Sequence, residues 1–242
     1  MSGVLYWFLW VAVRGLGRLY FGLRVDHAER VPRSGGVLLA ANHASYLDIP
    51  ILGCGAPRRL WYMGRRDLFP VPGFRWIFRA LGWIPIRPDR LDRQGFTEAI
   101  ELIRQGKAVV IYPEGGRTVT GDLRHGKPGL GMIVAQTNCP VVPVHLGGTF
   151  EAMPPGRGWP KPARITVRFG EAIQFPPVVE GAEKAFYQQV SREVMARIAE
   201  LGQVDVPTGT TPTRARAPRE TPPTSPSPTS ESLHAERGSG LS

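Results

Sequence analysis

Apolar runs of strand length alternate with helical patterns from residue 25 to residue 206, and this alternation constrains the fold more than any other feature of the chain. Short, uninterrupted apolar runs predict buried strands, whereas apolar residues at intervals of three and four predict amphipathic helices. The runs predicted as strands are 37–41, 59–63, 83–86, 108–112, 141–144 and 165–169. The helical patterns are 74–81, 94–105 (with Asp92 as its N-cap), 130–137 and 183–201. The alternation predicts an α/β fold with a mixed, largely parallel sheet flanked by helices.

The first 24 residues predict a membrane-associated segment. Residues 4–13 form an uninterrupted apolar and aromatic run, which Arg14, Arg18 and Arg24 follow. The run is shorter than the roughly 20 apolar residues that a spanning helix needs. A signal peptide would carry its basic residues before the apolar run, and here the order is reversed. Aromatic residues and arginines at helical spacing favour an amphipathic helix in the membrane interface, on the cytoplasmic face of the cell membrane. The alternative is an N-terminal helix packed on the core.

The last 36 residues, 207–242, are rich in Pro, Ser and Thr and contain few apolar side chains. Burial of such a segment cannot offset the entropy lost on ordering it, so we expect a disordered tail. The intervening residues, 25–206, then form a single catalytic or binding domain of ordinary size. The predicted organisation is therefore an N-terminal interfacial segment (1–24), one domain (25–206) and a disordered tail (207–242).

The overall charge predicts an anionic partner. The chain has a formal net charge of +10, which suits nucleic acid, an anionic lipid surface or a phosphorylated substrate. Its basic residues are dispersed rather than arranged in stripes with exposed aromatics, so we expect no nucleic-acid partner. The two cysteines lack metal-type spacing and are too few for a disulfide framework, which favours a reducing compartment.

A histidine and a carboxylate follow the strand predicted at 37–41. The sequence there is Asn42-His43-Ala44-Ser45-Tyr46-Leu47-Asp48. A histidine at a strand end can accept a proton near neutral pH if a second group fixes its tautomer, and Asp48 has the charge to do so. Taken alone, a histidine five residues before an aspartate is more often a surface accident or a capped helix start.

Two further polar clusters follow predicted strands. Arg87 comes directly after 83–86, and Glu114-Gly115-Gly116-Arg117 closely follows 108–112. Guanidinium groups match phosphate bidentately, and glycines allow close backbone approach to an anion. Each cluster alone is also good turn chemistry or a solvated strand end. Because parallel strands end at one edge of a sheet, the three clusters together predict a single cleft with a base, its carboxylate and two arginines.

Other cofactor chemistry is not indicated. The five histidines show no metal-ligand spacing, and no glycine-rich nucleotide motif lies between a strand and a helix. We therefore expect neither a metal nor a bound cofactor.

The ordered motifs resemble a known family. Asn42-His43 with Asp48, residues 82–87, Pro113-Glu114-Gly115-x-Arg117, and Val142-Pro143-Val144 are similar to the four motifs of the glycerophospholipid acyltransferases. More narrowly, residues 25–172 resemble bacterial 1-acyl-glycerol-3-phosphate acyltransferases, the PlsC-like enzymes. The resemblance implies transfer of a fatty acyl group from acyl-CoA or acyl carrier protein to the free hydroxyl of lysophosphatidic acid, which gives phosphatidic acid. It also implies a membrane-associated enzyme of phospholipid biosynthesis whose co-substrate, not a cofactor, carries the acyl group.

The same resemblance implies roles for individual residues. His43 would be the general base and Asp48 its partner. The acceptor phosphate site would consist of Arg87, Glu114, Gly115 and Arg117, and Lys127 corresponds to a basic residue found downstream in related bacterial enzymes. The chain departs from the family pattern at Gly116, commonly Thr, and at Thr118, commonly Ser. Alternative interpretations are acylation of another lysolipid such as lyso-ornithine lipid, acylation of glycerol 3-phosphate, or a non-catalytic lipid-binding membrane protein.

The fatty acyl chain requires an apolar binding site. The candidates are the apolar side chains of one short region: Phe69, Phe74, Trp76, Ile77 and Phe78. The plainer interpretation of this group is hydrophobic core.

Overall fold

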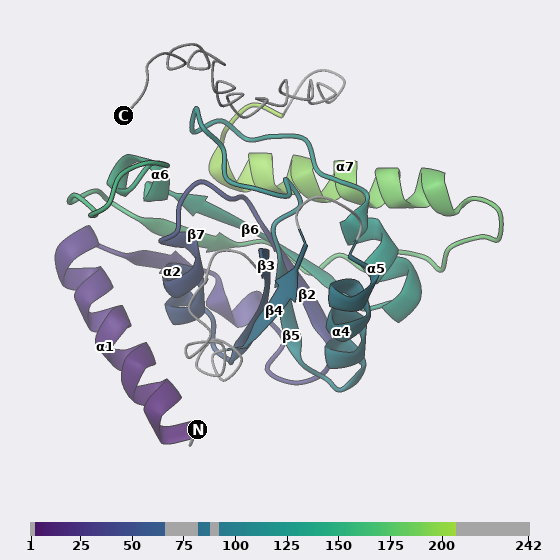
Figure 1. Cartoon of the computed structure of the whole chain (residues 1–242), viewed down its shortest axis with the longest axis horizontal. Helices are drawn as coiled ribbons and strands as arrows, with labels where there is room; N and C mark the ends of the chain where they lie inside the picture. Colours follow the sequence, from purple (N-terminus) through teal and green to yellow (C-terminus); the bar gives the residue numbers. More distant parts are fainter. Residues whose placement is uncertain (1–2, 66–81, 88–91, 207–242) are drawn as a thin grey trace, which may run out of the picture. The chain divides into compact units, whose positions relative to one another are not determined.

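The computed structural model describes residues 3–65, 82–87 and 92–206, and in that part of the chain the fold is built on one seven-stranded sheet. Its strands are β1 (Arg24–Asp26), β2 (Val37–Ala41), β3 (Leu60–Arg65), β4 (Trp83–Ile86), β5 (Ala108–Ile111), β6 (Val141–Gly147) and β7 (Thr166–Phe169). The strand order is β1-β7-β6-β2-β5-β3-β4, and every neighbouring pair is parallel except β6–β7. The predicted α/β architecture with a mixed, largely parallel sheet is confirmed (Figure 1).

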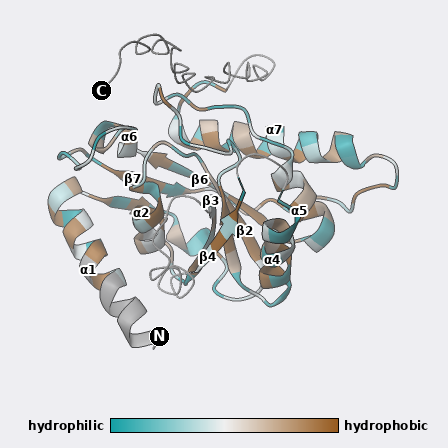
Figure 2. Cartoon of the chain, viewed as in Figure 1, coloured by the Kyte–Doolittle hydropathy of each residue, from teal (hydrophilic) through white to brown (hydrophobic). Residues whose placement is uncertain are grey.

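Helices cover both faces of the sheet. They are α1 (Gly3–Phe21), α2 (Asp48–Gly55), α4 (Arg93–Arg104), α5 (Gly129–Thr137), the short α6 (Thr149–Ala152) and α7 (Glu183–Gly202), with a 3₁₀ turn η1 (Ala28–Arg30). β2 shows how one strand supplies both layers. Leu38 and Ala40 pack in the apolar cluster shared with α4, α5 and α7, whereas Leu39 and Ala41 pack in the cluster shared with α2. Successive strand residues point to opposite faces, so a strand that is apolar throughout must be covered on both sides (Figure 2).

The helix predicted over 94–105 is present, and its start has a clear physical cause. The Asp92 carboxylate accepts hydrogen bonds from the backbone N–H groups of Gln94 and Gly95, which have no partner within the helix. Gly106, with φ of 77°, adopts the left-handed conformation that follows the helix end. These local signals placed the element from the sequence alone.

Four elements were not predicted: β1, α2, and the very short η1 and α6. Strand β1 is only three residues long, and Val25 lies between the charged Arg24 and Asp26, so the strand contains no apolar run. Helix α2 is short and buried, and Asp48-Ile-Pro-Ile-Leu-Gly-Cys-Gly lacks the amphipathic stripe by which helices are recognised. The helix predicted at 74–81, and with it the acyl-chain candidates Phe69, Phe74, Trp76, Ile77 and Phe78, lies outside the described residues.

Helix α1 packs one side on α2 and leaves the other in solvent. Arg14 donates a hydrogen bond to the Cys54 carbonyl at 2.6 Å, and Gly17 and Phe21 are buried, whereas Leu19 is exposed. No helix among the described residues is long and apolar enough to cross a membrane. The membrane role of residues 1–24 and the three segment boundaries stay predictions, and the tail from 207 lies outside the described residues.

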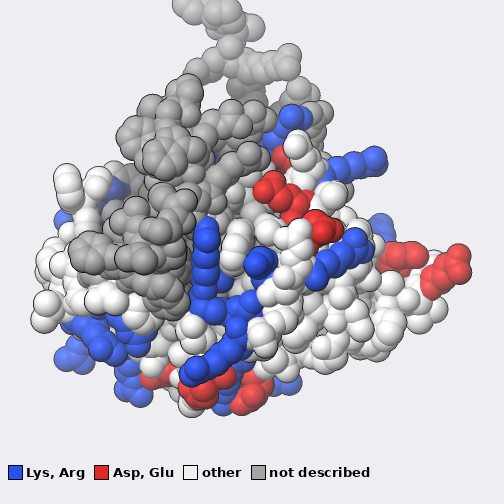
Figure 3. All heavy atoms as spheres, turned by 90° about the horizontal axis from the view of Figure 1, so that it is seen from below, with Lys and Arg blue, Asp and Glu red and all other residues white. Residues whose placement is uncertain are grey.

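Basic side chains are spread over the surface rather than gathered in one stripe. Figure 3 shows Lys and Arg distributed across one face of the molecule, with smaller groups of Asp and Glu among them. This pattern agrees with the dispersed charges in the sequence.

Candidate active site

Strands β2 and β5 bring the first and third polar clusters together. They pair in parallel with Ala40 opposite Ile111, so the residues that follow both strands emerge at the same edge of the sheet. His43 and Glu114 therefore meet: the His43 backbone N–H donates to Glu114 Oε1 at 2.9 Å. The Thr118 N–H in turn donates to the His43 carbonyl at 2.9 Å. The backbone of His43 is fixed on both sides by the loop that follows β5.

The His43 ring is oriented by Asp48. Nδ1 of His43 lies 2.8 Å from Oδ2 of Asp48, which is fully buried at the first turn of α2. The same oxygen accepts hydrogen bonds from the N–H groups of Ala44 and Ser45, each at 2.8 Å. An ionised carboxylate can only accept, so Nδ1 carries the hydrogen and Nε2 is left as the basic nitrogen. This tautomer is the one that general-base catalysis through Nε2 needs.

Tyr112 supports the ring from one face. The His43 and Tyr112 rings stack with centroids 4.0 Å apart and planes inclined by 19°. Burial and the nearby Asp48 charge raise the pKa of Tyr112 well above its usual value, so the phenol stays neutral. In the sequence, Tyr112 is only the last residue of an apolar run, because its contact with His43 depends on the pairing of β2 with β5.

Asn42 and Ser45 anchor the loop that carries His43. Asn42 donates to the Leu146 carbonyl at 3.0 Å and accepts from the Leu146 N–H at 2.7 Å, which extends the link between β2 and β6. The Ser45 hydroxyl donates to the Met153 carbonyl at 2.7 Å. Both side chains are buried and bond to backbone groups of other segments, so they position the loop, and Asn42 also lines the cavity on the His43 side.

Glu114 is buried beneath the histidine loop, and its predicted part in the phosphate site stays a prediction. Its side chain is 1% exposed, and one oxygen accepts a hydrogen bond from the His43 N–H. Burial raises the pKa of Glu114 to about 7. The sequence motif could not show that this side chain turns under the histidine loop, because that direction depends on the register of β5 against β2. The placement indicates a positioning residue for His43.

Tyr112 also lines a cavity that contains three of the four remaining residues predicted for the phosphate site. Its volume is about 490 Å³, and Arg87, Gly115 and Lys127 line it together with Arg65, which sequence reasoning missed. The apolar part of its wall consists of Met63, Ile86, Phe96, Ile111 and Leu130. Arg65 ends β3 and pairs with Ile86 of β4, so its position at a strand end was the signal available in the sequence. Cationic groups beside apolar walls suit a lipid with an anionic head.

Gly115 contributes through its shape. Its φ is 71°, and a Cβ atom there would come within 2.5 Å of Lys127 Nζ, so the residue allows Lys127 to lie across the loop. The Gly115 N–H is already bonded to the Tyr112 carbonyl at 3.0 Å. With its N–H engaged in this bond, Gly115 does not present a free amide to an oxyanion.

Arg117 is brought to the same edge of the sheet but packs differently from Arg87. Its guanidinium carbon lies 3.6 Å from the centre of the Tyr46 ring, a cation–π contact that joins the loop after β5 to the histidine loop. Arg117 does not line either of the two cavities described here. The predicted single cleft is thus represented, among the described residues, by two cavities that adjoin the His43–Tyr112 pair.

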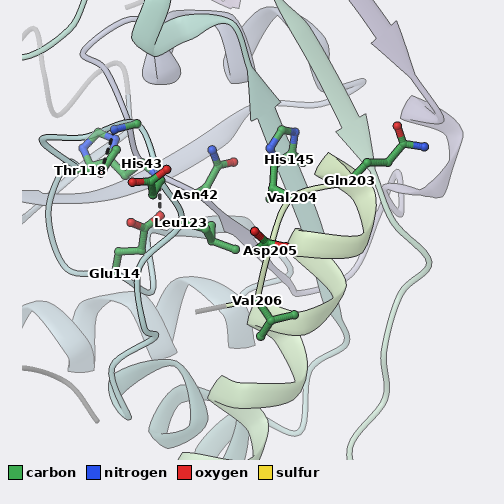
Figure 4. Close-up of a pocket in the computed structure, with 12 residues that line it drawn as sticks. Asn42, His43, Glu114, Thr118, Leu123, His145, Gln203, Val204, Asp205 and Val206 are labelled. Atoms are coloured by element: carbon green, nitrogen blue, oxygen red, sulfur yellow. Dashed lines mark hydrogen bonds between the residues drawn. The ribbon is translucent and has the colours of Figure 1, made fainter. Parts of the chain in front are cut away.

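The cavity on the His43 side is polar. His43, Thr118 and Glu114 lie on one side of it, and His145 and residues 203–206 lie on the other (Figure 4). Burial lowers the pKa of His145 to about 4, so this imidazole is neutral and a poor base. In the described part of the chain, no group of three or more His, Cys, Asp and Glu side chains could hold a metal ion.

Comparisons with known proteins agree with the geometry. A family model described as Acyltransferase matches residues 22–147. The 1-acyl-sn-glycerol-3-phosphate acyltransferase of Bacillus subtilis is 24% identical over 81% of this chain and 96% of its own length. The chloroplastic 1-acyl-sn-glycerol-3-phosphate acyltransferase BAT2 of Brassica napus is 30% identical over 57% of this chain, and the match spans 40% of that protein.

A solved structure shares the fold. The crystal structure of the 1-acyl-sn-glycerophosphate acyltransferase PlsC from Thermotoga maritima superimposes with a TM-score of 0.62 at 25% identity, and the match covers 80% of this chain and 79% of that one. A lyso-ornithine lipid O-acyltransferase of Pseudomonas aeruginosa is 32% identical over 49% of this chain and 45% of its own length.

Proposed function

Because the chain belongs to the Acyltransferase family, we propose that it transfers a fatty acyl group from acyl-CoA or acyl carrier protein to the free hydroxyl of lysophosphatidic acid, giving phosphatidic acid. The observation that carries this proposal is the His43–Asp48 pair beside a cavity with cationic and apolar walls. A general base, an anionic-headgroup site and an apolar surface are what acylation of a lysophospholipid needs.

The chemistry follows from the tautomer of His43. Nε2 takes the proton of the acceptor hydroxyl while that oxygen attacks the thioester carbon, and the thioester C=O becomes a tetrahedral oxyanion. Collapse of this intermediate breaks the C–S bond, and the imidazolium returns its proton to the thiolate. Asp48 keeps Nδ1 protonated and stabilises the imidazolium in between. General-base assistance of this kind contributes about 10²–10⁴ in rate.

Arg87 and Lys127 would hold the acceptor phosphate, since both line the cavity next to Tyr112. Arg117 would contribute from the loop after β5, where its guanidinium packs on Tyr46 of the histidine loop. The proposed reaction uses no metal or bound cofactor. The protein would act as a peripheral or monotopic enzyme on the cytoplasmic face of the cell membrane, with residues 1–24 in contact with phospholipid.

A second candidate acceptor is a lyso-ornithine lipid, favoured by the 32% identity to the Pseudomonas aeruginosa lyso-ornithine lipid acyltransferase. The two acceptors differ in their head groups. A phosphate dianion would interact with Arg65, Arg87 and Lys127 together, whereas an ornithine head group also carries an ammonium that these cations repel. The cavity therefore favours lysophosphatidic acid.

The proposal is tested by thin-layer separation of products from the purified full chain, labelled acyl-CoA or acyl carrier protein, and a panel of lysolipids. We expect product from lysophosphatidic acid that is lost in His43→Ala. His27→Asn is the matched control, because His27 is exposed and its φ of 62° is one that Asn tolerates. Undiminished transfer by His43→Ala, or no transfer to any lysolipid by the unsubstituted protein, would overturn the proposal.

A further inference from the structure

Exposed apolar side chains occur on two segments that are far apart in the sequence and in contact in the fold. On α1, Val11, Leu16 and Leu19 are 61%, 62% and 90% exposed. In the segment between α6 and β7, Trp159 is 85% exposed. Leu16 and Leu19 lie three residues apart and therefore share the helix face opposite the buried Gly17 and Phe21. Exposed large apolar side chains that gather on one surface indicate an interaction site.

Hydrogen bonds hold the two segments together. The Tyr20 hydroxyl at the end of α1 donates to the Pro160 carbonyl at 3.2 Å, next to Trp159. Arg157 Nε donates to the Trp159 carbonyl at 2.9 Å, and the Lys161 N–H donates to the Ala152 carbonyl at 2.9 Å. The backbone around Trp159 is thus fixed on both sides while its indole projects into solvent. The segment lies beside the end of α1 in Figure 1.

The charges around this surface are predominantly positive. Arg18, Arg157, Lys161 and Arg164 are exposed, and α1 contains no acidic residue. Glu151 is the one acidic residue in the stretch 149–164. Basic side chains around an apolar and aromatic surface complement a bilayer with anionic lipids, where tryptophan occupies the boundary between headgroups and acyl chains.

The surface adjoins the active site. The segment that carries Trp159 begins at Met153, whose carbonyl accepts the Ser45 hydroxyl hydrogen bond in the histidine loop. Just before it, the Phe150 ring packs against Gly121 of the loop after β5. A bilayer that contacts Trp159 therefore lies close to the loops that hold His43, which suits an enzyme whose acceptor is a membrane lipid.

We propose that Trp159 and the outer face of α1 form one bilayer-contacting surface, and that Trp159 is a second anchor which orients the catalytic loops toward anionic membranes. The inference rests on the membrane association included in the proposed function. A helix anchored alone can roll about its own axis, whereas a second contact displaced from that axis fixes the orientation of the domain.

The test uses the full chain with an environment-sensitive fluorophore on Trp159→Cys, and on Val179→Cys as the matched control. Val179 is 71% exposed and precedes α7 in a different part of the fold, and Cys54 and Cys139 are buried. With vesicles of phosphatidylcholine and phosphatidylglycerol, we expect emission at position 159 to intensify and shift to the blue, while position 179 does not respond. In sedimentation with the same vesicles, Trp159→Ala should bind roughly tenfold more weakly and Val179→Ala should bind like the unsubstituted protein.

The outcomes distinguish failure of the proposed bilayer-contacting surface from failure of the proposed acyl-transfer function. Vesicle binding without a fluorescence response at position 159, or with equal responses at positions 159 and 179, refutes the proposed bilayer-contacting surface. A response that grows with protein concentration and needs no vesicles would mean that a second copy covers Trp159, and also overturns it. Acyl transfer to detergent-solubilised lysophosphatidic acid by the unsubstituted protein tests the proposed function separately. Absence of acyl transfer is therefore distinguishable from absence of a fluorescence response at position 159.

Discussion

Asp48 offers the sharpest test of the site because, among the described residues, one of its oxygens has three hydrogen-bond partners and the other has none. Oδ2 accepts from His43 Nδ1, Ala44 N and Ser45 N, each at 2.8 Å, whereas Oδ1 has no hydrogen-bond partner among the described residues. Replacement by Asn and replacement by Ala should therefore have different consequences.

In Asp48→Asn, the N–H groups of Ala44 and Ser45 require an acceptor at the Oδ2 position, so the amide oxygen stays there. The Nδ1–H of His43 keeps its acceptor, and the useful tautomer is retained. The negative charge is lost, and the new amide NH2 group occupies the Oδ1 position, which has no hydrogen-bond partner among the described residues, so the free energy of unfolding should fall by about 1–3 kcal/mol. A hydrogen bond to a charged group contributes about 1.5–3 kcal/mol and a neutral one about 0.5–1.5 kcal/mol. The imidazolium loses about 1–2 kcal/mol of stabilisation, which lowers kcat by roughly 5- to 30-fold.

In Asp48→Ala, three donors lose their acceptor in a buried site and the His43 ring loses its orientation. Each unpaired buried donor costs about 1–3 kcal/mol, so the free energy of unfolding should fall by about 3 kcal/mol or more. The value of kcat should approach that of His43→Ala, a loss of about 10²–10⁴.

The assay is acyl transfer to lysophosphatidic acid in detergent micelles at saturating substrate, with urea unfolding of each variant. If Asp48→Asn is as inactive as His43→Ala while urea unfolding shows that it is fully folded under the assay conditions, preservation of the tautomer by the loop amides is refuted. If Asp48→Ala loses no more activity than Asp48→Asn, orientation of the ring by the carboxylate is refuted.

Three further variants test other parts of the site. Burial raises the pKa of Glu114 to about 7, so the folded state binds this proton more tightly than the unfolded state. As pH rises from about 4.5 through 7, the free energy of unfolding should therefore fall by up to about 3 kcal/mol relative to that of Glu114→Gln. The same pH dependence of the unfolding free energy in the two proteins, measured with urea, would contradict this. Lys127→Ala should raise the acceptor KM with little change in kcat. As a control, Lys184→Ala should leave both values unchanged, because Lys184 is exposed and does not line the cavity. An unaltered KM in Lys127→Ala excludes contact between Lys127 and the acceptor phosphate. Gly115→Ala places a methyl group against Lys127 Nζ in a left-handed backbone, so we expect a loss of about 1–2 kcal/mol in unfolding free energy and a raised acceptor KM, and unchanged thermal unfolding would argue against it.

Much of the sheet could be predicted because its strands are local apolar runs that must be covered on both faces. Residues 37–41 and 108–111 show this, since burial on both sides removes any alternation of polarity. The helix at Arg93–Arg104 was placed by its cap and its amphipathic pattern. Helix α2 was missed because it is short, mostly buried and apolar after Asp48, and has no side-chain cap, so neither signal is present.

The sequence by itself determined the class of fold and the chemical groups of the site, because strand runs, caps and the His43–Asp48 spacing are properties of short segments. The tertiary structure decided which of those groups face one another. The parallel register of β2 and β5 turns Glu114 under the His43 backbone and Tyr112 onto its ring, and the end of β3 adds Arg65 to the cationic cavity. Contacts of this kind join residues about 70 positions apart, as His43 and Glu114 are, and they depend on strand order and register, which no local pattern specifies.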